Sequence, residues 1–490
     1  MIRSIRETDL RVRSPVTTPE PSPSPDPLMT RPPPPLHLGI ASASATGAAN
    51  GSRNGSTDRA YPTVFLAFLS LFVGLTAAKV HEVFPPLAGL PVVKMVGGIF
   101  LLMAAARLDR GDLKALLRAP TARWISVIVI LAIASTPFSL WPGFSFEFLT
   151  TQLWQLVVLF AVVGAAAVDP RTRMVVIKAF AASAAIVALR MLAGGTQSVS
   201  GRVYAGSTFD PNESALLLVV AIPFAVGLAS RSQRWLWIGL AVVCALAAAM
   251  TGSRGGLLGL AALSGQMIYR AAPRRRLLYV VGIAGAASIL YASVGSDTKA
   301  RLSTVFSMEQ DYNASDRDGR IAVWKRGVGY MVQRPLLGVG VSCFPIAEGV
   351  MSGKLDVGFG VRYTAAHNSF VQVGAELGVL GLIAFCAALW TARRACISIP
   401  KRPSPTRGPD ASHSNDLHAM AVATESALVA FVVTGFFLSF AYQMVTFLLF
   451  ALAAGIHVDH ARVAHAHPRP RAGRGPQRPL GLRRVPLGAR

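Results

Sequence analysis

The chain has 490 residues, of which 52% are hydrophobic and only 15% charged, and its mean hydropathy is +0.47. This composition excludes an ordinary soluble protein, since several apolar runs approach the roughly 20 residues needed to cross a bilayer. The net charge of +24 does not indicate a nucleic-acid partner. Its Lys and Arg residues lie in the two terminal regions and in alternate loops, a distribution that orients membrane proteins.

The N-terminal residues 1–60 are rich in Pro, Ser, Arg and Gly. They cannot bury a core, so we expect a disordered cytoplasmic tail, and nothing in them resembles a signal peptide. The apolar runs that follow predict an all-α, polytopic transmembrane bundle of about 12 spans. The expected spans are 62–79, 86–106, 124–140, 152–168, 174–193, 214–230, 235–252, 255–269, 277–294, 367–390, 420–439 and 441–458.

These spans predict the domain organisation. Residues 61–294 hold the first nine spans and residues 367–458 the last three. Between them, residues 295–366 form one large extracytoplasmic loop with short amphipathic helices, and residues 459–490 form a second disordered cytoplasmic tail. The large loop is the longest polar segment flanked by spans, so we seek the functional site there and in the loops on the same side.

The loops that follow even-numbered spans carry clusters of Lys and Arg. These clusters lie at 107–123, 171–173, 231–234, 270–276 and 393–407. Short positively charged loops stay in the cytoplasm, whereas long translocated loops are largely exempt from this rule. We therefore expect both termini to be cytoplasmic and the 295–366 loop to face outward.

Three arginines share the outer face under this topology: Arg202, Arg254 and Arg320. Arg254 lies among small residues in TGSRGG, where backbone N–H groups and a helix start can approach an anionic group closely. A guanidinium binds a phosphate with two parallel hydrogen bonds. The alternative for Arg254 is an interfacial arginine that extends to lipid headgroups, and taken singly Arg202 and Arg320 favour that alternative.

The polar loop also holds an amphipathic helix candidate at 320–332, with Ile321, Trp324, Val328 and Met331 on one face. Arg334 and Pro335 are expected to end it.

His367 lies where the loop re-enters the membrane, and histidine is the side chain best suited to take a proton near neutral pH. On spacing alone, a structural histidine bonded to a neighbour fits as well. Glu376 would orient a partner or pair within the bundle. Asp311, Asp316 and Asp318 fit solvated surface charge better than a divalent-ion site.

The four cysteines are scattered, and Cys343 in the loop has no obvious partner there. Neither a disulfide framework nor a metal site is indicated, and no CxxC or HExxH motif occurs.

Four segments, in order, resemble the O-antigen ligase and polymerase superfamily of bacterial envelope glycosyltransferases. They are STFDPNESALLL at 207–218, TGSRGGLLGL at 251–260, GRIAVWKRGVGYMVQRPLLGVGVSCF at 319–344 and AAHNSFVQVGAELGVLGL at 365–382. Ligases of this family carry an outer-face Arg with a Leu four residues on, matched by Arg254 and Leu258. They also carry a His with a Gly eleven residues on, matched by His367 and Gly378. The resemblance covers residues 60–458 and leaves out both tails.

The resemblance implies a metal-independent, inverting glycosyltransferase of the bacterial inner membrane, with its active site on the periplasmic face and no cofactor. A glycan leaves its undecaprenyl-pyrophosphate carrier and joins an acceptor hydroxyl. By this resemblance Arg254 and Arg320 hold the pyrophosphate, Arg202 is a third candidate, and His367 is the general base. The implied partners are the lipid-linked glycan, a lipid A-core or polysaccharide acceptor, and membrane lipids.

Three classes of function remain open from the sequence: a glycosyltransferase, a transporter and a non-enzymatic scaffold. The enzyme is either a ligase that uses a lipid A-core acceptor or a polymerase that extends the growing chain, because both share these motifs. A capsule or exopolysaccharide polymerase and a protein-linked variant also remain open. A multispan transporter also suits twelve spans with both ends inside. Against a transporter, the polar segments cluster on one face and the chain shows no internal repeat. A non-enzymatic scaffold is the third possibility.

Overall fold

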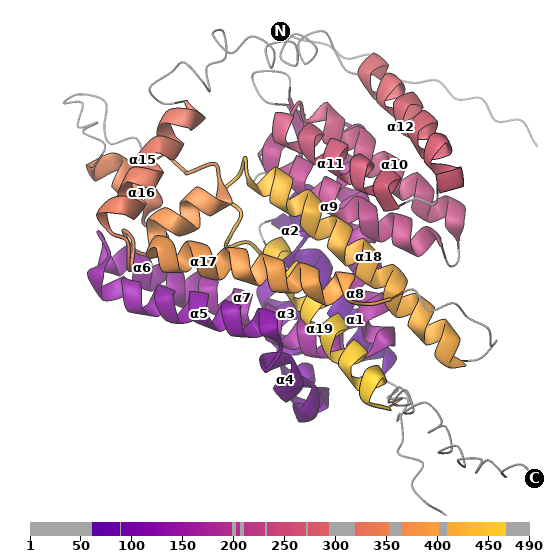
Figure 1. Cartoon of the computed structure of the whole chain (residues 1–490), viewed down its shortest axis with the longest axis horizontal. Helices are drawn as coiled ribbons and strands as arrows, with labels where there is room; N and C mark the ends of the chain where they lie inside the picture. The colour runs from indigo at the N-terminus through magenta and orange to yellow at the C-terminus, as the bar shows by residue number, and fades with distance from the viewer. Residues whose placement is uncertain are drawn as a thin grey trace, which may run out of the picture. The chain divides into compact units, whose positions relative to one another are not determined.

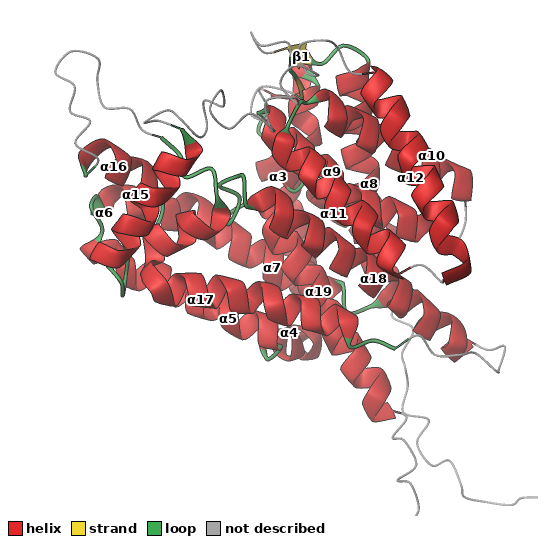
Figure 2. Cartoon of the chain, turned by 45° about the horizontal axis from the view of Figure 1, so that its top comes forward, coloured by secondary structure: helices red, strands yellow, loops and turns green. Residues whose placement is uncertain are grey.

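In the computed structural model, the described residues are 61–88, 90–197, 202–205, 210–230, 233–270, 273–293, 319–351, 364–400 and 409–466. They belong to one compact unit, Ala60–Arg490. Almost all of their secondary structure is helical (Figure 2). The expected tail 1–60, most of the expected tail 459–490, and Asp311, Asp316 and Asp318 lie outside the described residues.

The first part of this unit runs from Tyr61 to the short hairpin before residue 205. Its helices are α1 (Thr63–Thr76), η1 (Val80–Val83), α2 (Pro85–Ala88), α3 (Val92–Arg107), α4 (Arg110–Leu117), α5 (Pro120–Ser135), η2 (Thr136–Phe138), α6 (Pro142–Phe148), η3 (Leu149–Leu153), α7 (Trp154–Ala166) and α8 (Pro170–Leu192). Two short strands follow, β1 (Thr196–Gln197) and β2 (Val203–Tyr204), and they pair antiparallel.

The second part holds the remaining helices. They are α9 (Pro211–Ala229), α10 (Arg234–Met250), α11 (Arg254–Arg270), α12 (Pro273–Ser293), α15 (Arg320–Gln333), α16 (Phe344–Val350), α17 (Ser369–Ile397), α18 (Pro409–Gly435) and α19 (Met444–Ala466). α19 extends eight residues past the expected end of the last span at 458. The extension is stabilised by ion pairs of Asp459 with Arg173 and of Arg462 with Asp112.

Within the part of the chain that the structure describes, seven helical segments are long and apolar enough to cross a membrane. They are Pro120–Phe138, Pro142–Ala166, Pro170–Leu192, Pro211–Ala229, Ser369–Ile397, His413–Gly435 and Met444–His465. The other five expected spans fall on α1, α3, α10, α11 and α12, which are 14 to 21 residues long. The hydrocarbon core of a bilayer offers no hydrogen-bond partners, so a crossing segment must satisfy its own backbone N–H and C=O groups, as a helix does. The all-α, polytopic membrane architecture is confirmed, and the number of twelve spans stays a prediction.

Local sequence explains where several helices begin. Asp169 and Asp210 each precede a proline, and each carboxylate accepts hydrogen bonds from backbone N–H groups in the first turn of its helix. Asp is a favoured N-cap residue, and Pro is favoured at the first helical position because its missing N–H has no partner there anyway. The Asp-Pro pairs therefore set the starts of α8 and α9.

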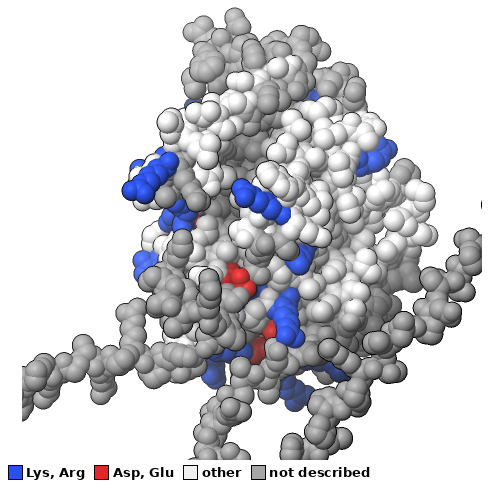
Figure 3. Space-filling model, turned by 90° about the vertical axis from the view of Figure 1, so that its right-hand side faces the viewer, with Lys and Arg blue, Asp and Glu red and all other residues white. Residues whose placement is uncertain are grey.

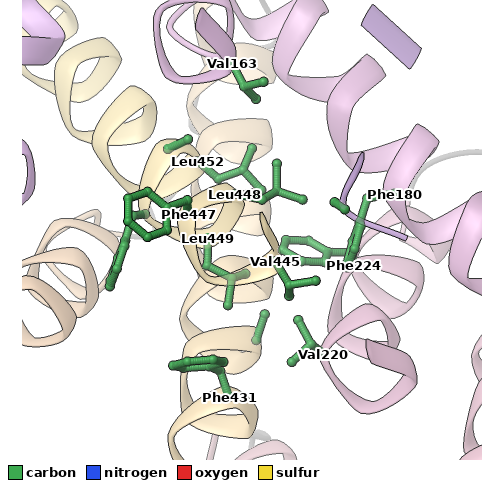
Figure 4. Close-up of a cluster of buried hydrophobic side chains, with 14 of the residues drawn as sticks. Val163, Phe180, Val220, Phe224, Phe431, Val445, Phe447, Leu448, Leu449 and Leu452 are labelled. Carbon is green, nitrogen blue, oxygen red and sulfur yellow. The ribbon is translucent and has the colours of Figure 1, made fainter. Parts of the chain in front are cut away.

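α19 lies in the middle of the packed core. Figure 4 shows Val445, Leu448, Leu449 and Leu452 of α19 among buried side chains from neighbouring helices. Close approach of α19 to α7 is possible because Gly455 faces the backbone of α7, where an added Cβ would lie 2.9 Å from the Gly164 carbonyl oxygen. Small residues at such contacts maximise van der Waals packing between helices in lipid.

The two ends of the bundle differ. Figure 1 shows α15 and α16 at one end, and α4 with the last turns of α19 at the opposite end. On the face shown in Figure 3, most described atoms belong to uncharged residues, which suits contact with hydrocarbon.

The expected amphipathic helix exists as α15, but its packed face differs from the expected one. Val323, Gly327 and Tyr330 are buried, whereas Ile321 and Val328 are exposed. Gly327 explains the rotation, because a side chain at that position would collide with Val371 and Phe344. The glycine lets α15 lie close against α17 and α16.

Candidate active site

His367 lies on a tight turn that is anchored at both ends. Its φ is 47°, in the left-handed region that non-glycine residues rarely adopt and that often marks functional sites. The next residue, Asn368, is the N-cap of α17, and its Oδ1 accepts from the N–H groups of Phe370 (2.9 Å) and Val371 (3.0 Å). Ser369 Oγ donates to the Leu438 carbonyl at 2.7 Å. The imidazole is thus placed by a rigid turn.

Arg320 begins α15, and this helix start is tied to the His367 turn. One turn into α15, Trp324 Nε1 donates to the carbonyl of Ala366 at 3.0 Å. Burial lowers the pKa of His367, the positive charge of Arg320 lowers it further, and the negative charge of Asp210 partly opposes both. A half-buried imidazole in this field stays neutral at neutral pH, as a general base requires.

Arg254 is the first residue of α11. Ser253 Oγ accepts from the Gly256 N–H at 3.2 Å and so caps this helix start. The neighbouring Gly255 packs under Phe437, where an added Cβ would lie 3.0 Å from the Phe437 Cβ. The Phe437 ring is 6.2 Å from the Trp324 ring. This chain of contacts connects Arg254 to α15 and the His367 turn.

Arg202 is held by the protein. Its Nε donates to the carbonyl of Thr251 at 2.9 Å, and its Nη2 donates to Asn212 Oδ1 at 2.8 Å. These bonds join the turn before α11 to the start of α9. Arg202 therefore positions the turn that carries Arg254.

The structure thus brings the four predicted residues to one end of the bundle. The charge of Arg320 acts on His367, the residue after Arg254 is connected to α15 by packed aromatic rings, and Arg202 is bonded to the turn before α11. Arginines at the starts of α11 and α15 add to the partial positive charge of helix N-termini, and together they favour an anion.

Sequence reasoning missed Asp210. This carboxylate caps α9 by accepting from the N–H groups of Asn212 (2.6 Å) and Glu213 (2.7 Å), and its charge acts on His367. The Asp-Pro pair signals a helix cap, but nothing local signals a partner more than 150 residues away.

Glu376 has the anchoring role that the sequence left open. Its wholly buried carboxylate accepts from the backbone N–H of Ser342 (3.0 Å) and of Phe344 (3.3 Å). Two residues later, Gly378 breaks α17 with a φ of 73°. The Val379 N–H then donates to the Pro335 carbonyl at 2.8 Å. The segment after α15 thus supplies a hydrogen-bond partner for the backbone of α17 at the break.

A second buried carboxylate joins α15 to α16. Arg326 binds Glu348 through two nitrogens, with Nε–Oε1 and Nη2–Oε2 distances of 2.9 and 2.6 Å, and Tyr330 Oη donates to Glu348 Oε1 at 2.8 Å. Burial raises the pKa of Tyr330. The two helices and their turn form a preassembled support for Arg320.

Cys343 is buried in this support as a free thiol and lies 3.2 Å from Ser145 Oγ. Burial raises the pKa of this thiol, so it is unreactive at neutral pH. Among the described residues, no group of three or more His, Cys, Asp or Glu side chains is placed to hold a metal ion.

Comparison with known proteins identifies one family. Residues 239–386 match the family described as O-antigen ligase. The matched segment contains Arg254, Arg320 and His367 and leaves out Arg202. No curated protein matches the chain.

Proposed function

Because residues 239–386 place this chain in the O-antigen ligase and polymerase superfamily, we propose that it transfers a glycan from undecaprenyl pyrophosphate to an acceptor hydroxyl. We assign it as a ligase with a lipid A-core acceptor. The alternative acceptor is the non-reducing end of a growing lipid-linked chain, which would make it a polymerase. The observation that carries the proposal is a half-buried histidine whose pKa is lowered beside an arginine at a helix start.

The leaving group explains the arginines. When the bond between the anomeric carbon and the phosphate oxygen breaks, its electron pair and negative charge pass to the pyrophosphate. Arg254 and Arg320 would stabilise this charge as it develops, which is commonly the largest contribution to catalysis. In this proposal two guanidinium groups and two helix N-termini act in place of a metal ion. Arg202 contributes indirectly, by holding the turn before Arg254.

His367 would activate the acceptor. Its neutral imidazole takes the proton of the acceptor hydroxyl while that oxygen forms a bond to the anomeric carbon, on the face opposite the departing pyrophosphate. Opposite-face attack inverts the anomeric configuration. Asp210 would stabilise the imidazolium that forms, because its carboxylate raises the pKa of His367.

The proposed orientation puts this end of the bundle in the periplasm. The chain would cross the bacterial inner membrane about 12 times with both termini in the cytoplasm. Each expected span falls on a helix, and the expected cytoplasmic cluster at 107–123 includes α4, which lies at the end opposite α15 (Figure 1).

The test is transfer by purified protein supplied with a polyprenyl-pyrophosphate-linked glycan and a lipid A-core acceptor. We expect His367→Ala and Arg254→Ala to lower kcat/KM by about 100-fold or more, the usual contribution of a general base or an anion-stabilising donor. Arg394→Ala is the matched control, because Arg394 lies near the other end of α17 and stacks on Trp390.

Normal transfer by both site variants would overturn the catalytic assignment. Elongation of the donor in the absence of a lipid A-core acceptor would assign the polymerase. Absence of transfer by the purified wild-type protein, together with glycan attachment in cells that tolerates charge reversal at Arg202, Arg254 and Arg320, would indicate a scaffold.

A further inference from the structure

Four aromatic side chains gather beside the His367 turn. Trp324 comes from α15, Phe370 from α17, and Phe436 and Phe437 from the turn that ends α18. We call these four residues the aromatic cluster. The Trp324 and Phe436 rings are 5.2 Å apart in an edge-to-face arrangement, Phe436 and Phe437 are 5.4 Å apart, and Phe370 and Phe436 are 6.3 Å apart.

The aromatic cluster lies between the two arginines proposed to bind pyrophosphate. Trp324 is one turn after Arg320 and donates to Ala366, the residue before His367. Phe437 packs on Gly255, the residue after Arg254. A group covalently attached to a pyrophosphate at these arginines would therefore meet the aromatic cluster first.

The aromatic cluster is accessible, and its surface is apolar. Phe436 is 42% exposed, and Val432, one turn earlier on α18, is 37% exposed. Leu258, one turn after Arg254, is 49% exposed. The single polar atom of the four side chains, Trp324 Nε1, is already bonded to a carbonyl. Sugar hydroxyls would find no hydrogen-bond partner on these rings, whereas an unsaturated hydrocarbon loses nothing by leaving lipid to pack on them.

We propose that the aromatic cluster binds the first isoprene units of the donor's polyprenyl chain, with the chain leaving over Val432 into the bilayer. This inference rests on the proposed function, since it takes the pyrophosphate to lie between Arg254 and Arg320. Flat ring faces match the planar, methyl-bearing double bonds of isoprene units. The aromatic cluster would thus select a polyprenyl carrier over an ordinary phospholipid.

The experiment measures binding and transfer separately. Purified protein in phosphatidylcholine nanodiscs is titrated with undecaprenyl pyrophosphate that carries no glycan, and transfer kinetics are recorded with the glycan-linked donor. For Phe436→Ala we expect a Kd and a KM about tenfold higher, the change that ~1.4 kcal/mol produces, with kcat unchanged. Phe436→Leu should recover part of the loss. Trp390→Ala removes an aromatic side chain, 56% exposed, about two turns before the C-terminal end of α17 and is the matched control.

The outcomes separate this inference from the proposed function. If wild-type protein binds undecaprenyl pyrophosphate more tightly than Phe436→Ala does, but transfers no glycan, the isoprenoid site stands and the proposed function fails. If wild-type protein transfers glycan and Phe436→Ala matches it in Kd and KM, the isoprenoid site is wrong. Equal competition by phosphatidylglycerol and undecaprenyl phosphate would also overturn it, because the aromatic cluster would then bind acyl chains in general.

Discussion

At the scale of single residues, the charges around His367 decide whether it can act as a base. The imidazole is half-buried, which by itself disfavours its protonated form. Arg320 disfavours that form further, and Asp210 favours it. These opposing charges come from the starts of α15 and α9, so the proton affinity of His367 depends on how helices are placed around it.

The pH dependence of transfer tests this arrangement. The acid limb of kcat/KM should follow protonation of His367, because only the neutral imidazole can accept a proton. Arg320→Gln removes a charge that lowers the pKa of His367, so the acid limb should move to higher pH. Asp210→Asn removes a charge that raises this pKa while an Asn can still cap α9, so the limb should move to lower pH. The control is Glu147→Gln, on the exposed face of α6, which should leave the pH profile unchanged. If the acid limb moved in the same direction in Arg320→Gln and Asp210→Asn, the roles given to these two charges would be wrong.

At the scale of elements, α17 carries His367 at its start and is broken in its interior. Gly378 adopts a φ of 73° and a ψ of −171°, a conformation nearly restricted to glycine. A Cβ there would collide with the carbonyl oxygen of Pro335. The break lets the segment after α15 pack against α17. Gly378, eleven residues after His367, is therefore needed for the contact between α17 and the helix that carries Arg320.

Gly378→Ala should therefore destabilise the protein by about 1–3 kcal/mol or more from backbone strain and collision. The measurement is thermal unfolding of detergent-solubilised protein, followed by intrinsic fluorescence. The control is Gly265→Ala on α11, where an added Cβ meets no atom within 4 Å. That control should be neutral or stabilising because Ala has the higher helix propensity. Equal unfolding temperatures for the two variants would refute the role given to Gly378.

The ion pair between α15 and α16 gives a second prediction at this scale. Glu348 is fully buried, so Glu348→Gln removes the carboxylate charge that pairs with Arg326 and should cost about 3–5 kcal/mol. Replacing both partners, as Arg326→Met with Glu348→Leu, should restore much of that stability, because neither charge is then buried. Glu147→Gln is the matched control, because Glu147 lies on the exposed face of α6, and it should change the free energy of unfolding by no more than about 0.5 kcal/mol. Unfolding by denaturant measures all three, and a double variant no more stable than Glu348→Gln would argue against the pairing.

At the scale of the whole molecule, ion pairs tie several helices together at the end of the described bundle away from the candidate site. The end with α15 holds the candidate site. The ion pairs of Arg173 with Asp459 and of Arg462 with Asp112 tie α8, α19 and α4 together. Glu425 of α18 binds Arg270 and Arg393, the last and near-last turns of α11 and α17. These ion pairs hold the helices together at the end opposite the candidate site.

Orientation in the membrane can be measured with cysteines introduced at exposed lysines. In a Cys386→Ser background, Lys325→Cys on α15 should react with a membrane-impermeant maleimide added to spheroplasts. Lys114→Cys on α4 should react only after the membrane is permeabilised, because α4 belongs to the positively charged side. The opposite labelling pattern would invert the proposed topology and move the site to the cytoplasm.

The sequence alone determined the membrane class, the helical runs, the extent of α15 and a short set of candidate residues. Hydropathy and helix periodicity are properties of contiguous residues, and a bilayer demands that each crossing segment satisfy its own backbone. The Asp-Pro pairs mark the starts of α8 and α9 at residues 170 and 211, whereas the spans expected from hydropathy began later, at 174 and 214.

Only the tertiary structure decided what several of these residues contact. Arg202 bonds to residues 10 and 49 positions away, and Arg326 pairs with Glu348, 22 positions away. Glu376 holds a turn 32 to 34 positions earlier, and the packed face of α15 follows from Gly327. These partners lie on separate helices and turns, and the sequence around either one does not specify the other. They meet because helix packing in three dimensions brings their ends together.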